Sequence, residues 1–168
     1  MIDAIIVAAA LYGAGAPVDV AFATPIGALS VGVDPVVLAG YVLSEHPGGR
    51  WSSSCSDAGA CGHFQLARLW ERRYDDDEPG DQRERAWTAA PIAAAVIAYS
   101  RERHEDCGDG HGHGWRAHMK CGTGSRDSCK WPVQRWRDEE ASVRETVGNA
   151  HRWLRLLGLA SWDGGGEA

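Results

Sequence analysis

Apolar and small residues recur along the chain at three- and four-residue spacing, and they rarely alternate with polar ones. In the C-terminal part this spacing gives one face of a long helix, formed by Val143, Val147, Ala150, Leu154 and Leu157. No alternating run of β-branched or aromatic residues extends beyond a few positions, although the turn-rich stretch 52–64 can hold a small hairpin. The pattern therefore predicts a mainly α-helical protein.

Capping residues next to prolines mark where the predicted helices begin, because a proline lacks only an N–H that the first helical turn leaves unused. The predicted starts are Thr24-Pro25, Asp34-Pro35, the stretch 88–91 and Pro132. Glycine-containing segments mark the ends. The predicted ends are Gly32, the stretch 47–49, the stretch 108–114 and Gly158.

The first sixteen residues are apolar and end in Ala14-Gly15-Ala16, which faintly resembles a signal-peptide cleavage site. A signal peptide also needs a basic N-terminal region, and Asp3 stands where a Lys or Arg would be expected. We therefore predict a buried helix that ends at Gly13.

Length and charge exclude several classes of protein. The 168 residues carry 17 basic and 23 acidic side chains, a net charge of −6, so no basic surface is predicted to bind nucleic acid through its phosphates. The sequence contains no uninterrupted apolar run of about 18 residues, so no membrane span is predicted. We expect one monomeric domain over residues 1–160, followed by a flexible tail over 161–168.

One acidic residue occupies a position where an apolar one is expected. Leu38, Tyr41, Val42 and Glu45 fall on one stripe of the helix predicted to start at Asp34. Burial and the negative end of the helix dipole both favour the protonated carboxyl group, which is the form that a general acid requires. The alternative is that Glu45 turns outward beside the Pro-Gly-Gly segment and is solvated.

The surrounding motifs resemble the lysozyme-like lytic transglycosylases, a family of peptidoglycan-cleaving enzymes that also resembles goose-type lysozymes. Val33-Asp34-Pro35 leads into the helix that ends at Glu45, and Ser56-x-x-Gly59-Ala60-x-Gly62-x-x-Gln65 follows; the resemblance covers about residues 24–122. It implies a lysozyme-like helical domain with a small loop or hairpin after the catalytic helix. It also implies that Glu45 is the catalytic acid and that Gln65 contacts the glycan strand.

Other positions follow the family less closely. The stretch 92–99 is similar to the family's next core helix, whose aromatic end, here Tyr99, reaches the substrate cleft, and Trp115 stands near the place of a further aromatic element. The sequence departs from the family at Met119 and Lys120, where Tyr-Asn is usual, and at His46, where Ser or Thr is usual. Aromatic residues such as Tyr99 and Trp115 serve equally in sugar stacking and in core packing.

The resemblance implies cleavage of the MurNAc–GlcNAc β-1,4 bond with a single glutamate as acid and base. In a lytic transglycosylase the sugar's own 6-hydroxyl then attacks and leaves a 1,6-anhydro end. Ser56 and Asp57 belong to the predicted substrate-binding loop. If Asp57 is a second carboxylate rather than a turn residue, water takes the place of that hydroxyl and the enzyme is a lysozyme.

The cysteine and histidine residues bear on the location of the protein and suggest an alternative to the enzymatic function. Five cysteines favour an oxidising, extracytoplasmic location, in the periplasm, the cell wall or a virion, and the pairs 55/61 and 121/129 are spaced to close short loops. A structural zinc ion is the alternative, with Cys107, Cys121, Cys129 and His111 or His113 as ligands, but no paired zinc-knuckle spacing is present. We expect no cofactor. The alternative function is a non-catalytic module that binds cell wall or is stapled by zinc, for example in a phage-like particle or secretion apparatus.

Overall fold

The computed structural model describes residues 1–57, 59–74, 81–103 and 133–157 of the chain. These residues form six α-helices, two short 3₁₀ helices and one two-stranded hairpin, which confirms the prediction of a mainly α protein with a small hairpin. The α-helices are α1 (Ile2–Gly13), α2 (Val18–Ser30), α3 (Pro35–Glu45), α4 (Arg68–Tyr74), α5 (Ala86–Arg103) and α7 (Val133–Leu156). The remaining elements are η1 (Pro47–Gly49), β1 (Ala60–Cys61), β2 (Leu66–Ala67) and η2 (Gln82–Glu84).

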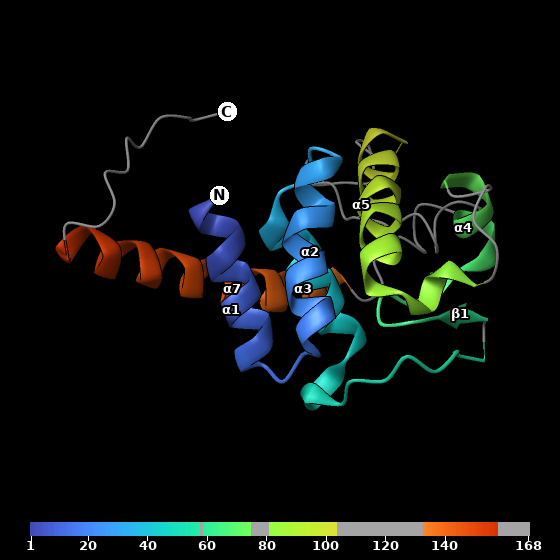
Figure 1. Ribbon diagram of the computed structural model, residues 1–168, viewed down its shortest axis with the longest axis horizontal. Helices are drawn as coiled ribbons and strands as arrows, with labels where there is room; N and C mark the ends of the chain where they lie inside the picture. Colours follow the sequence, from blue (N-terminus) through green and yellow to red (C-terminus); the bar gives the residue numbers. More distant parts are fainter. Residues whose placement is uncertain (58, 75–80, 104–132, 158–168) are drawn as a thin grey trace.

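The helices pack around two adjoining hydrophobic clusters. One cluster lies between α2, α3, α5 and the hairpin and includes Leu38, Tyr41, Phe64 and Ile97. The other joins α1, α2, α3 and α7. Figure 1 shows α1, α2 and α5 side by side, with α7 crossing behind α1, and the hairpin and α4 beyond α5. α2 and α3 contribute to both clusters and therefore lie at the centre of the described fold.

Two glycines allow helices to approach closely. A Cβ atom on Gly27 of α2 would lie 2.8 Å from the Ala90 carbonyl carbon of α5. A Cβ atom on Gly40 of α3 would lie 2.8 Å from the Glu140 Cα of α7. A side chain at either position would push the helices apart, because backbone atoms cannot rotate out of its way.

The helix starts show where local signals are sufficient. Asp34 caps α3 as predicted, since its Oδ1 accepts a hydrogen bond of 2.9 Å from the Val36 amide. The predicted start at Thr24-Pro25 is wrong: α2 begins at Val18 and continues through Pro25. The Thr24 hydroxyl donates instead to the Val20 carbonyl oxygen, one turn earlier in the same helix. The buried location of both residues favours a continuous helix here.

The other expected elements are largely present. α1 ends at Gly13 as predicted, but the prediction that it is buried holds for one side only, because Ile5 and Tyr12 are exposed. α7 begins at Val133, next to the proline expected to start it. α5 begins at Ala86, slightly before the predicted start, so Pro91 lies inside it. No helix within the described residues is both long and apolar enough to cross a membrane. The flexible tail predicted over 161–168 lies outside these residues.

Candidate functional site

Glu45 is the last residue of α3, and its side chain is partly buried. The stripe predicted from the sequence is present, because Leu38, Tyr41 and Val42 are fully buried on the same side of this helix. The Asp34 cap fixes the other end of α3. The carboxylate is therefore carried by a helix that the core holds along its whole length.

Two contacts tie the last turn of α3 to the hairpin turn. The Tyr41 hydroxyl donates to the Phe64 carbonyl oxygen. Nε2 of His46 lies 2.8 Å from the His63 carbonyl oxygen. Tyr41 is one helical turn before Glu45 on the same face, and His46 directly follows it. These contacts on either side place Glu45 beside the turn that carries Gln65.

His46 also holds the loop that follows α3. Its ring is almost completely buried and stacks on Trp51, with ring centroids 4.4 Å apart and planes 27° apart. Nδ1 of His46 lies 3.4 Å from the Arg50 carbonyl oxygen. The Trp51 Nε1 in turn donates to the Ala14 carbonyl oxygen over 3.1 Å. The loop after Glu45 is thereby fastened to the turn between α1 and α2.

The neighbouring His63 has a perturbed imidazole. Burial is the main cause that lowers its pKa below 6.5, electrostatic interaction with His46 lowers it further, and Asp19 opposes the shift. Its Nδ1 is buried and has no hydrogen-bond partner among the described residues. His63 is therefore a neutral group at neutral pH, in the hairpin turn next to His46 at the end of α3.

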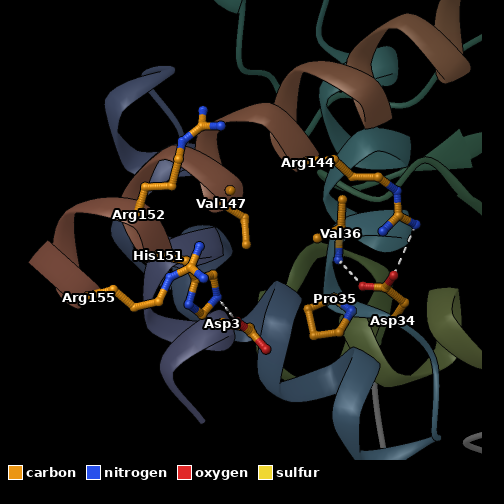
Figure 2. A pocket seen from close by; sticks show the side chains of 10 residues that line it. Asp3, Asp34, Pro35, Val36, Arg144, Val147, His151, Arg152 and Arg155 are labelled. Carbon is orange, nitrogen blue, oxygen red and sulfur yellow. Dashed lines mark hydrogen bonds and ion pairs between the residues drawn. The ribbon is translucent and has the colours of Figure 1, made fainter. Parts of the chain in front are cut away.

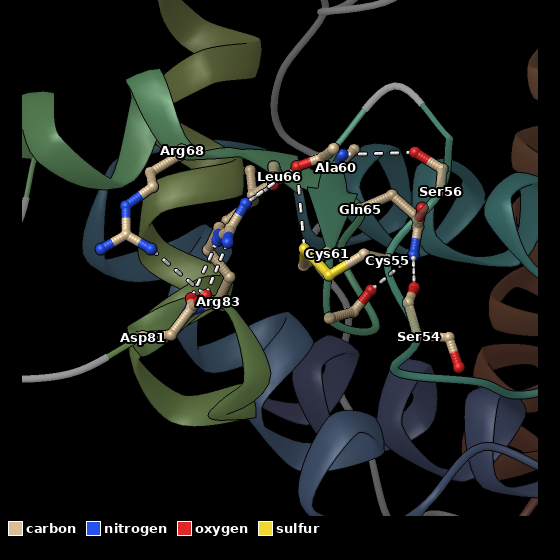
Figure 3. The surroundings of a disulfide bond; sticks show 12 residues. Ser54, Cys55, Ser56, Ala60, Cys61, Gln65, Leu66, Arg68, Asp81 and Arg83 are labelled. Atoms are coloured by element: carbon tan, nitrogen blue, oxygen red, sulfur yellow. Dashed lines mark hydrogen bonds and ion pairs between the residues drawn. A yellow bond between two sulfur atoms is a disulfide. The ribbon is translucent and has the colours of Figure 1, made fainter.

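The hairpin region is closed by a disulfide between Cys55 and Cys61, one of the two pairs expected from the spacing (Figure 3). Within this loop the Ser56 Oγ accepts a hydrogen bond of 3.2 Å from the Ala60 amide. The Gly59 amide donates to the Ser56 carbonyl oxygen over 2.8 Å. Ser56 is thus used to shape the loop.

Gln65 closes the same region from its other end. It adopts a left-handed backbone conformation with φ of 44°, which is uncommon outside glycine. Its Nε2 donates to the carbonyl oxygens of Ser54 and Gly62, over 3.0 and 2.9 Å (Figure 3). The amide nitrogen of Gln65 therefore ties the two ends of the loop together.

A buried arginine supports the hairpin from beneath. Arg83 donates from Nη1 to the Gly59 carbonyl oxygen at 2.9 Å, and it forms ion pairs with Asp81 and Glu71. Hydrogen bonds from Arg83 lower the pKa of Asp81 to about 2. Gly62 packs directly on the Arg83 backbone, where an added Cβ atom would lie 1.7 Å from the carbonyl oxygen. The hairpin therefore rests on η2 with no room for a side chain at this position.

The remaining candidate residues are more dispersed. Asp57 lies exposed in the disulfide-closed loop. Tyr99 of α5 packs against Trp70 of α4, with ring centroids 5.8 Å apart, so its described role is in the core. Trp115 lies outside the described residues. The structure thus brings the last turn of α3 and the loop containing Ser56 and Gln65 to one site.

A separate cavity of about 470 Å³ lies at the opposite end of α3. Figure 2 shows Arg144 turned toward Asp34 on one side of it and His151 turned toward Asp3 on the other. Asp34 and Glu45 are eleven positions apart on the helix, which corresponds to roughly 16 Å. This cavity is therefore distinct from the site at Glu45.

Sequence reasoning missed the roles of His46, His63 and Arg83. In the sequence His46 is only a departure from a family motif, and its contact with a carbonyl oxygen seventeen residues away has no local signal. Arg83 likewise bonds a carbonyl oxygen twenty-four residues away. One signal in the sequence could have indicated the burial of His46: it directly follows Glu45, at the end of the helix predicted to be buried.

The described residues contain no group of three or more His, Cys, Asp or Glu side chains placed to hold a metal ion. The predicted zinc ligands Cys107, Cys121 and Cys129, with His111 or His113, lie outside those residues. Neither a protein-family model, nor a curated protein, nor a solved structure matches this chain.

Proposed function

We propose that this protein cleaves the β-1,4 bond between MurNAc and GlcNAc in peptidoglycan, with Glu45 as its single catalytic acid and base. The observation that carries the proposal is the placement of Glu45. It is a partly buried carboxylate in the last turn of a core helix. Contacts on both sides of Glu45 tie this turn to the hairpin turn at His63 and Phe64, next to Gln65.

This placement suits a general acid. Such a group has to approach the glycosidic oxygen within hydrogen-bond distance, and it works best where bulk water is partly excluded. Glu45 is neither fully buried nor fully exposed. The contacts of Tyr41 and His46 hold the end of α3 against the hairpin turn, so the backbone that carries the carboxylate has a fixed position, as catalysis requires.

In the proposed reaction the Glu45 carboxyl group gives its proton to the glycosidic oxygen, and the bond between that oxygen and the MurNAc C1 breaks. The resulting carboxylate then takes the proton of the 6-hydroxyl group of the same MurNAc, and the 6-oxygen atom attacks C1. The product is a 1,6-anhydro end, and Glu45 regains its proton. This route needs no second carboxylate and consumes no water.

Hydrolysis is the alternative chemistry at the same site. Asp57, exposed in the disulfide-closed loop, is the candidate for the second carboxylate that hydrolysis would need. A water molecule then attacks C1 in place of the 6-hydroxyl, and the product is an ordinary reducing end. The two routes differ in product mass by one water.

The disulfide favours an extracytoplasmic site of action, because such bonds persist in oxidising compartments. Peptidoglycan lies in those compartments, so the proposed substrate and the disulfide agree. Secretion, or delivery by a phage-like particle, is compatible with this location.

A non-catalytic module is the second candidate. It is favoured by the use of Gln65, whose amide nitrogen bonds to two carbonyl oxygens of its own loop. A residue employed in this way stabilises a binding surface even where no bond is cleaved. This module would bind glycan strands without releasing fragments.

The loss of turbidity of a peptidoglycan suspension tests for cleavage directly. We expect the wild-type protein to clear the suspension and Glu45→Gln to lose at least about a hundredfold in rate, since it can neither donate nor accept the proton. Glu145→Gln, at an exposed position of α7, is the matched control and should retain full activity. If the Glu45→Gln protein clears the suspension at the wild-type rate, Glu45 is not the catalytic residue.

A further inference from the structure

α2 carries a row of large apolar side chains that no other described element covers. Val18, Phe22, Ile26 and Leu29 recur at four- and three-residue spacing, which places them on one stripe of the helix. The opposite side of α2 is buried against α1, α3 and α5. The stripe therefore faces away from α3.

α1 carries a matching stripe. Ile5 and Tyr12 lie two helical turns apart and are exposed on one side of α1, whereas Val7, Ala8 and Leu11 are buried. α1 and α2 pack against each other and both pack on α3, so their uncovered sides face away from it (Figure 1). We call the surface formed by Ile5, Tyr12, Val18, Phe22, Ile26 and Leu29 the α1–α2 outer face.

Each of these six side chains is between 47% and 62% exposed. At about 150–200 Å² for a large side chain, together they expose on the order of 500–600 Å² per molecule. Isolated exposed apolar residues are ordinary, but contiguous patches of this size usually mark an interaction surface. Stable dimers bury about 800 Å² per partner. The α1–α2 outer face with its polar margin approaches that area.

The charges that α1 and α2 themselves carry favour one kind of partner. The chain contains no Lys or Arg before Arg50, and Asp3 and Asp19 are the only ionic side chains on α1 and α2. A membrane-binding helix pair would carry basic residues to attract anionic lipids. A second copy of this chain needs no complementary charge, since the apolar side chains themselves form the centre of the contact.

We propose that a second copy of this chain covers the α1–α2 outer face, in a two-fold symmetric dimer in which α1 and α2 of each copy pack on those of the other. The same surface then serves both copies, as two-fold symmetry requires. The proposal departs from the monomer expected from the sequence. It does not rest on the proposed enzymatic activity, because the contact excludes the hairpin that lies next to Glu45.

Sedimentation equilibrium of the purified protein tests this proposal. With an area at the low end for dimers, we expect a dissociation constant on the order of micromolar, so that the mean mass rises from monomer to dimer between roughly 1 and 200 µM. Phe22→Asp and Ile26→Asp combined should weaken the dimer by at least about tenfold, because carboxylates from both copies would meet in an apolar contact.

Leu69→Asp is the matched control, since Leu69 is an exposed apolar residue on α4, away from the α1–α2 outer face. It should leave the dissociation constant unchanged. Circular dichroism checks that each variant is folded, and Ile5→Asp replaces the double variant if that protein fails to fold. A wild-type protein that stays monomeric throughout this range overturns the proposal, as does a dimer unaffected by the substitutions on the face. Co-sedimentation of the monomer with anionic vesicles would then assign the face to a lipid surface.

Discussion

Replacing Gly62 with alanine tests whether the hairpin rests on η2 as closely as the structure shows. Gly62 has a φ of 75°, and its added Cβ atom would lie 1.7 Å from the Arg83 carbonyl oxygen. A backbone oxygen cannot rotate away, so η2 and the hairpin would have to separate. This movement would also disturb the Arg83 guanidinium, which bonds the Gly59 and Leu66 carbonyl oxygens.

Gly59 provides the matched control for the Gly62 substitution. Its φ of 77° is nearly the same, but no atom lies within 4 Å of its added Cβ. Gly59→Ala therefore costs only the left-handed backbone strain, about 1–2 kcal/mol. Gly62→Ala adds an overpacking cost of about 1–3 kcal/mol, for a total loss of about 2–5 kcal/mol.

Urea denaturation of both oxidised proteins, followed by circular dichroism, measures the two losses in the free energy of unfolding. The difference between the variants isolates the contact with Arg83, because the backbone strain is common to both. Equal losses for Gly59→Ala and Gly62→Ala would refute the close packing of the hairpin on η2.

Three further perturbations test other parts of the fold. Hydrogen bonds from Arg83 lower the pKa of Asp81 from 3.8 to about 2, so Asp81 stabilises the fold above pH 3.8 and less as the pH falls toward 2. Asp81→Asn should flatten this pH dependence of the unfolding free energy, and an unchanged slope contradicts the pairing. Burial lowers the pKa of His63, so its imidazole should titrate below pH 6.5 when followed by NMR. Because the pKa is lower in the folded state, protonation of His63 favours unfolding. A titration midpoint above 6.5 argues against the burial of His63. Gly40→Ala should destabilise the fold by about 1–3 kcal/mol, because its Cβ atom would lie 2.8 Å from the α7 backbone. Gly148→Ala has open space around the added Cβ atom and should stabilise the fold by up to about 1 kcal/mol through helix propensity. Thermal unfolding measures both changes.

The part of the fold that the sequence predicted depends on short-range interactions. The start of α3 was predictable because Asp34 caps an amide two residues away. The buried stripe that ends in Glu45 was predictable because helical periodicity is also local. The same local signal at Thr24-Pro25 was misleading, because packing of that segment against the core maintains one continuous helix from Val18.

The site around Glu45 was predictable only in part, because long-range contacts to backbone oxygen atoms assemble the rest of it. His46 reaches the carbonyl oxygen of His63, and Arg83 reaches that of Gly59. A carbonyl acceptor is present at every residue, so the sequence carries no mark of which one is used. The seven-residue helix α4 was missed for a related reason, since it has no capping motif and is held by the burial of its Trp70.

The mass of the fragments released from purified peptidoglycan tests the central claim most directly. The account predicts anhydro-ended fragments from the wild-type protein and none from Glu45→Gln, with both proteins folded. Reducing ends, heavier by one water, would keep the glycosidase but replace the transglycosylase route with hydrolysis and make Asp57 the next residue to change. Fragments released equally by both proteins, or by neither, would contradict the proposal that Glu45 cleaves the glycan strand.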